Sequence, residues 1–127
     1  MVKMSQVIRM TKDFFQEQYR FWPSSIGICH VRSAGHYIVH PGFRGVPMKK
    51  DFFELFWSIR GCGYFKLKDE ICALPEGKIF CYFPGDYHDV FAGEERWEYY
   101  WMTMDGGGLS LLVERFGFCH EGQEAGS

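Results

Sequence analysis

Short runs of alternating apolar and polar residues, separated by Gly and Pro, fill the chain from residue 26 to residue 105. Such runs predict short β-strands joined by turns about every ten residues, which is typical of a small sandwich or barrel. So many strands in this stretch leave little room for helices, and we predict an all-β domain. The predicted strands cover residues 26–31, 36–40, 51–60, 64–68, 71–74, 78–83, 88–92 and 96–104.

The run DFFELFWSIR at residues 51–60 departs from simple alternation. Apolar residues occupy both odd and even positions of this run. A strand with one solvent-facing side would alternate, so we expect both faces of this strand to be covered. One face would line the barrel interior, and the other would meet a helix or a second subunit.

The pattern changes at both ends of the chain. Residues 11–20 begin with a possible helix N-cap, Thr11, and are compatible either with a short helix or with an extended arm on the barrel. Residues 109–116 place apolar side chains three and four positions apart, which predicts an amphipathic helix ended by Gly117. The last seven residues carry no large apolar side chain and are predicted to be frayed. The chain is thus divided into an N-terminal arm (1–25), a β-barrel domain (26–105), and the start of a helix with a frayed C-terminus (106–127).

Composition narrows the class of protein. Aromatic residues make up 19% of the 127 residues, which excludes a disordered chain and a coiled coil. Fourteen Lys and Arg against sixteen Asp and Glu give a net charge of −2, which argues against a free-standing nucleic-acid-binding domain. The N-terminus lacks the apolar segment of a secretion signal, and no apolar run approaches the ~18 residues of a membrane span. We therefore expect a cytoplasmic protein, whose five cysteines, without a C-x-x-C pair, are reduced and buried.

Two short motifs flank the predicted hairpin in the middle of the chain. Glu54 stands seven residues before Gly61, and Gly77 is followed by the corner Pro-Gly-Asp-Tyr-His that ends at His88. In this order, the two motifs resemble those of the cupin superfamily. The resemblance implies a double-stranded β-helix barrel.

The metal-binding part of the cupin motif is missing from this sequence. Metal-binding cupins carry His-x-His four or five residues before the glutamate, whereas residues 47–50 here are Pro-Met-Lys-Lys. Methionine is a poor ligand for hard metals, and a protonated lysine has no free lone pair. Because Glu54 and His88 alone are too few ligands for a mononuclear site, we expect no metal and no other cofactor.

A longer resemblance covers residues 26–118. The Pro-Gly-x-x-His corner, the strand with Trp97 and Trp101, and the glycines after it are similar to the effector-binding and dimerisation domain of AraC-family transcription regulators. In that family the barrel interior binds a small molecule, a sugar in the founding member, and helix-turn-helix units bind DNA. The resemblance implies a sugar-sensing homodimer without enzymatic activity. It also implies that DNA is bound only through a C-terminal domain absent from this chain.

The same resemblance suggests ligand-binding residues. Trp101 takes the position of the ring that stacks on the sugar, Tyr99 takes a neighbouring polar position, and Arg44 lies near the position of the family's effector-binding arginine. His88 is expected either to contact the ligand or to hold the corner as a structural histidine. Glu54 is costly to bury unpaired, so we expect it to pair with Arg44 or His88 or to bind the ligand. Rows of aromatic side chains on barrel strands more often belong to the core than contact a ligand. Both roles therefore remain open for Trp101 and Tyr99.

Three functions remain open at this point. The first is the ligand-sensing regulatory domain. The second is a small metal-independent cupin enzyme acting on a sugar or sugar derivative, with His88 as base and Tyr99 as acid. The third is a structural barrel, which would be favoured if Trp97 and Trp101 were wholly buried with no cavity beside them. The charged residues 49–51 are expected to form a solvated turn.

Overall fold

The computed structural model of the chain describes residues 3–11, 15–22, 30–106, 115 and 123–124. Most of these residues lie in strands, which confirms the prediction of an all-β domain. In the described part of the chain, the strands are β1 (Lys3–Met10), β2 (Phe15–Trp22), β3 (His30–Val39), β4 (Met48–Lys49), β5 (Phe53–Arg60), β6 (Gly63–Leu67), β7 (Glu70–Leu74), β8 (Lys78–Tyr82), β9 (Tyr87–His88), β10 (Val90–Ala92), β11 (Trp97–Asp105) and β12 (Gln123–Glu124).

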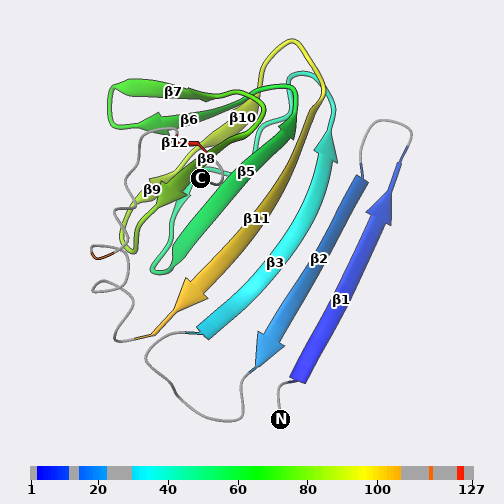
Figure 1. Cartoon of the computed structure of the whole chain (residues 1–127), viewed down its shortest axis with the longest axis vertical. Helices are drawn as coiled ribbons and strands as arrows, with labels where there is room; N and C mark the ends of the chain where they lie inside the picture. The colour runs from blue at the N-terminus through cyan, green and yellow to red at the C-terminus, as the bar shows by residue number, and fades with distance from the viewer. Residues whose placement is uncertain (1–2, 12–14, 23–29, 107–114, 116–122, 125–127) are drawn as a thin grey trace.

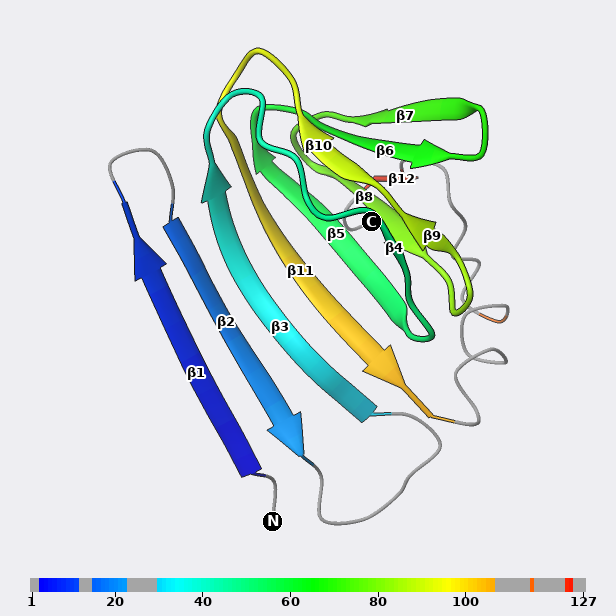
Figure 2. The ribbon, with the colours of Figure 1, turned by 180° about the vertical axis from the view of Figure 1, so that it is seen from behind.

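The described strands form one large sheet and two small ones. The large sheet has the order β1-β2-β3-β11-β5-β8-β12, and the small sheets are β10-β6-β7 and β4-β9. Figures 1 and 2 show β1, β2, β3, β11 and β5 side by side in one curved layer. The short strands β6, β7, β9 and β10 gather against the part of this layer formed by β5 and β8. The two groups of strands are the walls of the barrel.

Aromatic side chains from both walls form the core. Phe65 on β6 meets Phe56, Phe80 and Trp97 of the large sheet, with ring centroids 4.8, 4.3 and 5.8 Å away. Trp97 is fully buried, and its Nε1 donates a hydrogen bond to Ser58 Oγ at 2.8 Å. The polar atom of this indole is therefore satisfied inside the protein, and Trp97 belongs to the core.

Several predicted strands agree with the structure, and one predicted break does not. The strands expected at 51–60, 64–68, 71–74, 78–83 and 96–104 correspond to β5, β6, β7, β8 and β11. β3 runs without interruption from His30 to Val39, so the division expected between residues 31 and 36 is wrong. Gly35 lies inside β3 because the indole of Trp101, its partner on β11, fills the space of a side chain at that position. The strand expected at 88–92 is divided into β9 and β10.

The N-terminal segment forms a hairpin, β1-β2, that extends the large sheet. β1 pairs with β2 along its whole length, and β2 pairs with β3 from Phe15 to Arg20. The helical alternative for residues 11–20 is therefore wrong over residues 15–20, and the extended alternative is correct in backbone conformation. β2 lies beside β3 and not across the barrel, since the edge of β3 offers backbone N–H and C=O groups that need partners.

β5 buries one face from Glu54 to Ser58 and the other face in part. Glu54, Phe56 and Ser58 point inward and are buried. On the opposite face Phe53 is buried, whereas Trp57 is 43% exposed in the single chain. The prediction that both faces are covered thus holds near Phe53, and cover of Trp57 by a second subunit stays a prediction.

The C-terminal predictions fall largely outside the described residues. The helix expected at 109–116 lies outside them except for Arg115. Of the tail expected to be frayed, the described residues Gln123 and Glu124 form β12 and pair with β8. Among the described residues, no helix is long and apolar enough to span a membrane. The described cysteines, Cys62, Cys72 and Cys81, are free thiols.

Candidate functional site

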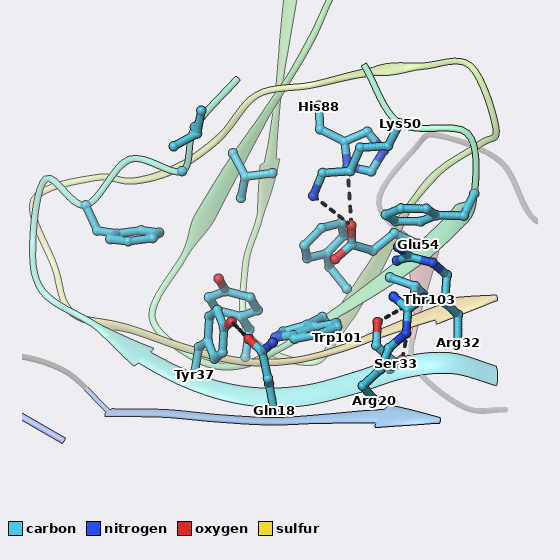
Figure 3. Close-up of a pocket in the computed structure, with 17 residues that line it drawn as sticks. Gln18, Arg20, Arg32, Ser33, Tyr37, Lys50, Glu54, His88, Trp101 and Thr103 are labelled. Atoms are coloured by element: carbon cyan, nitrogen blue, oxygen red, sulfur yellow. Dashed lines mark hydrogen bonds and ion pairs between the residues drawn. The ribbon is translucent and has the colours of Figure 1, made fainter. Parts of the chain in front are cut away.

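A cavity of about 320 Å³ lies between the two walls of the barrel, beside Trp101. Strands β2, β3, β11 and β5 supply one side of its lining. Phe43, Gly45 and Val46, from the loop before β4, and Val90 of β10 supply apolar cover. Figure 3 shows the polar side chains that point into it, among them Arg20, Arg32, Glu54 and His88.

The register of the large sheet brings four polar side chains into one row. Arg20 of β2 pairs with Ser33 of β3, Ser33 pairs with Thr103 of β11, and Thr103 pairs with Glu54 of β5. Residues opposite each other on neighbouring strands share a face of the sheet, so all four side chains face the cavity. The hydroxyls of Ser33 and Thr103 are hydrogen-bonded to each other. This row is the polar end of the cavity.

The next row along the strands contains Trp101. It passes from Gln18 through Gly35 to Trp101 and on to Phe56. A Cβ built on Gly35 would lie 2.3 Å from Cε2 of the indole, so only glycine leaves room for the ring. Tyr37 packs edge-on against Trp101 at 5.6 Å and donates a hydrogen bond from its hydroxyl to Gln18 Oε1 at 2.8 Å. Trp101 is only half-buried and borders the cavity, which disfavours the structural-barrel alternative.

Glu54 is 6% exposed and lies beneath Lys50 and His88 (Figure 3). Its Oε1 is 3.3 Å from Nδ1 of His88 and 3.7 Å from Nζ of Lys50. Of the two partners expected for Glu54, the structure therefore supplies His88 and not Arg44. Lys50, expected with residues 49 and 51 in a solvated turn, is a second partner of Glu54 and lines the cavity, so that expectation is wrong for Lys50, whereas residues 49 and 51 are exposed.

Several polar atoms around the cavity are buried and have no hydrogen-bond partner in the described part of the chain. They are Oε1 of Glu54, both ring nitrogens of His88 and Nε1 of Trp101. The ion-pair contacts of Glu54 are too long or too poorly aligned to count as hydrogen bonds. Buried donors and acceptors of this kind are normally satisfied, by protein, water or ligand. Their concentration beside one cavity indicates a binding site.

Tyr99 lines the cavity and is almost fully buried. Its ring is 4% exposed and stacks on Trp97 with centroids 3.8 Å apart. Burial, together with the neighbouring Tyr37 and Glu54, raises the pKa of Tyr99 well above its ordinary value. The phenol therefore stays protonated at neutral pH and can act as a hydrogen-bond donor.

Arg44 is placed outside the cavity that contains Trp101, Tyr99, His88 and Glu54. Its guanidinium donates two hydrogen bonds to the carboxylate of Asp89, at 2.7 and 2.8 Å. The backbone of Arg44 forms a bridge with Phe91, and the Arg44 side chain is 55% exposed. Arg44 thus has a structural partner, and the structure does not bring it together with the other four suggested residues.

Two arginines of the cavity, Arg32 and Arg20, were missed by the sequence analysis. Between Thr103 and Met104 the pairing with β3 skips one residue, and the skipped residue is Arg32. This β-bulge directs Arg32 to the same side as Ser33, against the alternation that a sequence pattern assumes. Arg20 lies on β2, where polar residues at alternate positions 16, 18 and 20 were the available signal.

The residues present do not fit a mononuclear metal site. Glu54 and His88 are the ligands that a cupin motif would supply here, and the ammonium group of Lys50 lies beside the same carboxylate oxygen. A third and fourth ligand are required for stable binding. Within the described ranges, no group of three or more His, Cys, Asp and Glu side chains could hold one metal ion.

Solved structures that superpose on this chain include a cupin barrel protein. A variant of oxalate decarboxylase from Bacillus subtilis superposes with a TM-score of 0.60 and 15% identity, over 91% of this chain and 36% of that chain. A Cupin 2 conserved barrel domain protein from Salinispora arenicola CNS-205 also gives a TM-score of 0.60 and 15% identity, over 86% of this chain and 90% of that chain. This chain thus spans about a third of the decarboxylase and most of the single-barrel protein. At this level of identity the likeness shows the cupin fold.

Family membership follows from the sequence match. A comparison with curated proteins found no match. The family model of the AraC-like ligand binding domain, in contrast, matches residues 30–123, which contain most of the barrel and the residues of the cavity except Gln18 and Arg20. The chain therefore belongs to the family of AraC-like ligand binding domains.

Proposed function

We propose that this chain is the effector-sensing domain of an AraC-type transcription regulator and that a small carbohydrate binds in the cavity beside Trp101. The observation that carries the proposal is the set of buried polar atoms of Glu54, His88 and Trp101 around one cavity that have no hydrogen-bond partner among the described residues. The volume of about 320 Å³ suits a small ligand, since ligand cavities span about 300–1,000 Å³.

The cavity offers the two kinds of contact that a sugar needs. The ring of Trp101 provides an apolar surface for the C–H face of a pyranose or furanose. Glu54 accepts hydrogen bonds from hydroxyls, while the protonated Tyr99 and the indole N–H of Trp101 donate to them. A sugar bound here supplies hydrogen bonds to buried groups that have none from the residues that the structure describes.

Regulation in this proposal links the N-terminal hairpin to the ligand. Gln18 and Arg20 of β2 reach the cavity, whereas its other polar groups belong to the barrel. A ligand that contacts both the hairpin and the barrel stabilises the position of the hairpin in which these contacts form. Coupling between ligand binding and regulation requires such a difference in contacts between two positions of the hairpin. In this proposal the domain acts in the cytoplasm as a homodimer, and the regulator binds DNA through helix-turn-helix units rather than through the barrel.

The test is a binding screen with mono- and disaccharides, read as thermal stabilisation of the purified chain. A ligand that binds only the folded state raises the melting temperature by an amount that grows with its concentration. Trp101→Ala should abolish the shift produced by the best sugar. Trp57→Ala, which removes an exposed indole on the outer face of β5, should leave it unchanged. The proposal fails if no sugar stabilises the protein, or if Trp101→Ala retains the full shift.

A second candidate is the metal-independent cupin enzyme, and the contact between His88 and Glu54 is the observation that favours it. A carboxylate 3.3 Å from Nδ1 can orient an imidazole as a general base, and Tyr99 can serve as acid in the same cavity. The two candidates differ in the fate of the sugar. NMR spectra of a stabilising sugar incubated with the protein should show it unchanged for a sensor, whereas formation of a product that is lost in His88→Gln would establish the enzyme.

A further inference from the structure

One edge of β1 faces away from the rest of the large sheet. Among the described strands, β1 has β2 as its single partner, and the pairing extends from Lys3 to Met10. Figures 1 and 2 show β1 at the margin of the sheet, with no described strand beyond it. The free edge of a strand presents a row of backbone N–H and C=O groups with which a further strand can pair. The large sheet can therefore be extended at β1 by a strand from another chain.

β1 lacks the features that usually protect a free edge. Protected edges are commonly short, bulged, or marked by proline or by charged side chains. β1 has eight residues without a proline, and its pairing with β2 proceeds without a bulge. Its charged residues are Lys3 and Arg9, near its two ends, so residues 4–8 form an uncharged stretch.

The apolar side chains of β1 are exposed as well. Four of them are between 40% and 75% exposed in the single chain, namely Met4, Val7, Ile8 and Met10. A second strand beside β1 would cover part of this apolar surface in addition to pairing with the backbone. The exposed ring of Trp57 differs in this respect, because its strand, β5, is already paired on both sides with β11 and β8.

The order of residues in β1 decides how it can pair with a second copy of itself. Two antiparallel copies related by a two-fold axis perpendicular to the sheet keep each side chain on its own face when the axis passes through a residue position. The two longest registers of this kind pair residues 3–9, centred on Gln6, or residues 4–10, centred on Val7. The register centred on Gln6 places Lys3 opposite the partner's Arg9, and like charges opposite each other destabilise a sheet.

The register centred on Val7 avoids this repulsion. It places Arg9 opposite the partner's Ser5, and Met4 opposite the partner's Met10. Because of the two-fold symmetry, each of these contacts occurs twice. This register therefore pairs exposed methionines with each other and brings no two charges together.

We propose that β1 forms the dimer interface of this chain: two copies pair their β1 strands antiparallel, in the register centred on Val7, and join their large sheets into one. The inference rests on the homodimer of the proposed function and identifies the surface that forms it. Backbone hydrogen bonds stabilise the dimer, and the contacts between Met4 and the partner's Met10 select the register. The interface adjoins β2, the strand that carries Gln18 and Arg20 to the cavity.

The first experiment measures the mass of the complete 127-residue chain by analytical ultracentrifugation at increasing protein concentration. We expect a reversible equilibrium between monomer and dimer. Amide hydrogen exchange below and above the transition should show that β1 amides gain protection in the dimer, because those that face away from β2 acquire partners. A chain that stays monomeric up to millimolar concentration overturns the inference. A dimer in which the exchange of β1 amides is unchanged does so too.

Charged substitutions at residues 4 and 10 test the register. Met4→Lys/Met10→Lys places lysines opposite each other twice and should weaken the dimer by about tenfold or more. Met4→Glu/Met10→Glu should have the same effect with the opposite charge. Met4→Lys/Met10→Glu places opposite charges across the interface, so it should associate nearly as strongly as the parent. A mixed variant as weak as the other two would show that the strands do not pair in this way.

The control adds the same two positive charges elsewhere. Trp57→Lys/Ile71→Lys places them at exposed apolar side chains of β5 and of β7, a strand at the end of a small sheet, and should leave the dimer unchanged. Loss of the dimer in the control would indicate another interface or a general effect of net charge, and would overturn the inference. The measurements on the parent chain decide the matter even if a variant does not fold.

The outcomes separate this inference from the proposed function. Residues 4 and 10 lie on the face of β1 opposite to that of Val7, whose partner in register is Gln18 of the cavity. Met4→Lys/Met10→Lys should therefore still be stabilised by the sugar that stabilises the parent. A parent that binds sugar as a monomer removes the interface and leaves the sensor. A β1 dimer that binds no sugar leaves the interface and removes the carbohydrate sensor.

Discussion

Individual residues in this cavity are positioned by contacts that a sequence pattern does not contain. The place of Trp101 in a motif predicts that its ring stacks on the ligand. The orientation of that ring, however, depends on Gly35 of the neighbouring strand. The indole lies directly over this glycine, where a side chain would otherwise stand. Gly35 therefore has a positioning role in the site although it offers no functional group.

Substitution of Gly35 by Ala tests this role. The added methyl would lie 2.3 Å from the indole, so the ring must move, and such overpacking lowers the free energy of unfolding by about 1–3 kcal/mol. We expect weaker sugar binding as well, because the displaced indole no longer faces the ligand. Urea denaturation and calorimetric titration measure the two effects. Ala73→Val is the control, since it adds apolar volume at an exposed position of β7 outside the cavity and should change neither quantity appreciably. Unchanged sugar affinity in Gly35→Ala would contradict the positioning role.

Among the elements of the fold, the N-terminal hairpin has the largest consequence for the site. β2 supplies Gln18 and Arg20 to the cavity and covers the edge of β3, whereas β1 has β2 as its single partner among the described strands. The roles of the two strands can therefore be separated by truncation.

Deletion of residues 1–11 removes β1 and leaves β2 paired with β3. We expect this shortened chain to bind sugar with nearly unchanged affinity. Deletion of residues 1–22 removes both strands, so it should weaken sugar binding by about tenfold or more through loss of Gln18 and Arg20 from the cavity lining. It also uncovers the edge of β3, which promotes association between chains. Calorimetric titration and size-exclusion chromatography distinguish the two deletions. Equal binding by both would show that β2 contributes nothing to the site.

The other strands of the barrel show how much of the site could be predicted from the sequence. Gly and Pro punctuation located most strands between residues 51 and 104, and the motifs identified Glu54 and His88, because these signals are local. Arg32 was not predictable, since a bulge in the pairing with β11 turns it inward. Lys50 was assigned to solvent because its partner, Glu54, lies on β5 and meets it only after folding.

At the scale of the whole molecule, burial of tyrosines ties stability to pH. The ring of Tyr82 is fully buried in the core, and its hydroxyl donates a hydrogen bond to the Lys66 carbonyl oxygen at 2.8 Å. The same hydroxyl accepts a hydrogen bond from the N–H of Asp89 at 3.2 Å, so it connects the large sheet to the segment between β9 and β10. Burial, the largest cause, raises the pKa of Tyr82 to about 12, and the pKa of Tyr99 is raised in the same direction.

These shifts predict a loss of stability at alkaline pH. In the unfolded chain a tyrosine ionises with a pKa near 10, whereas Tyr82 in the folded chain keeps its proton up to about pH 12. The stabilising contribution is thus complete below about pH 10 and is lost as pH rises towards 12, because the unfolded state releases protons that the folded state retains. A pKa shift of about two units for one tyrosine contributes about 3 kcal/mol at most to the free energy of unfolding.

Tyr82→Phe should be less stable than the parent at pH 7 by about 1–3 kcal/mol, because two backbone groups lose their partner. The difference should narrow between pH 10 and 12, as measured by urea denaturation at each pH. A gap that stays constant across this range would show that Tyr82 does not carry the alkaline instability.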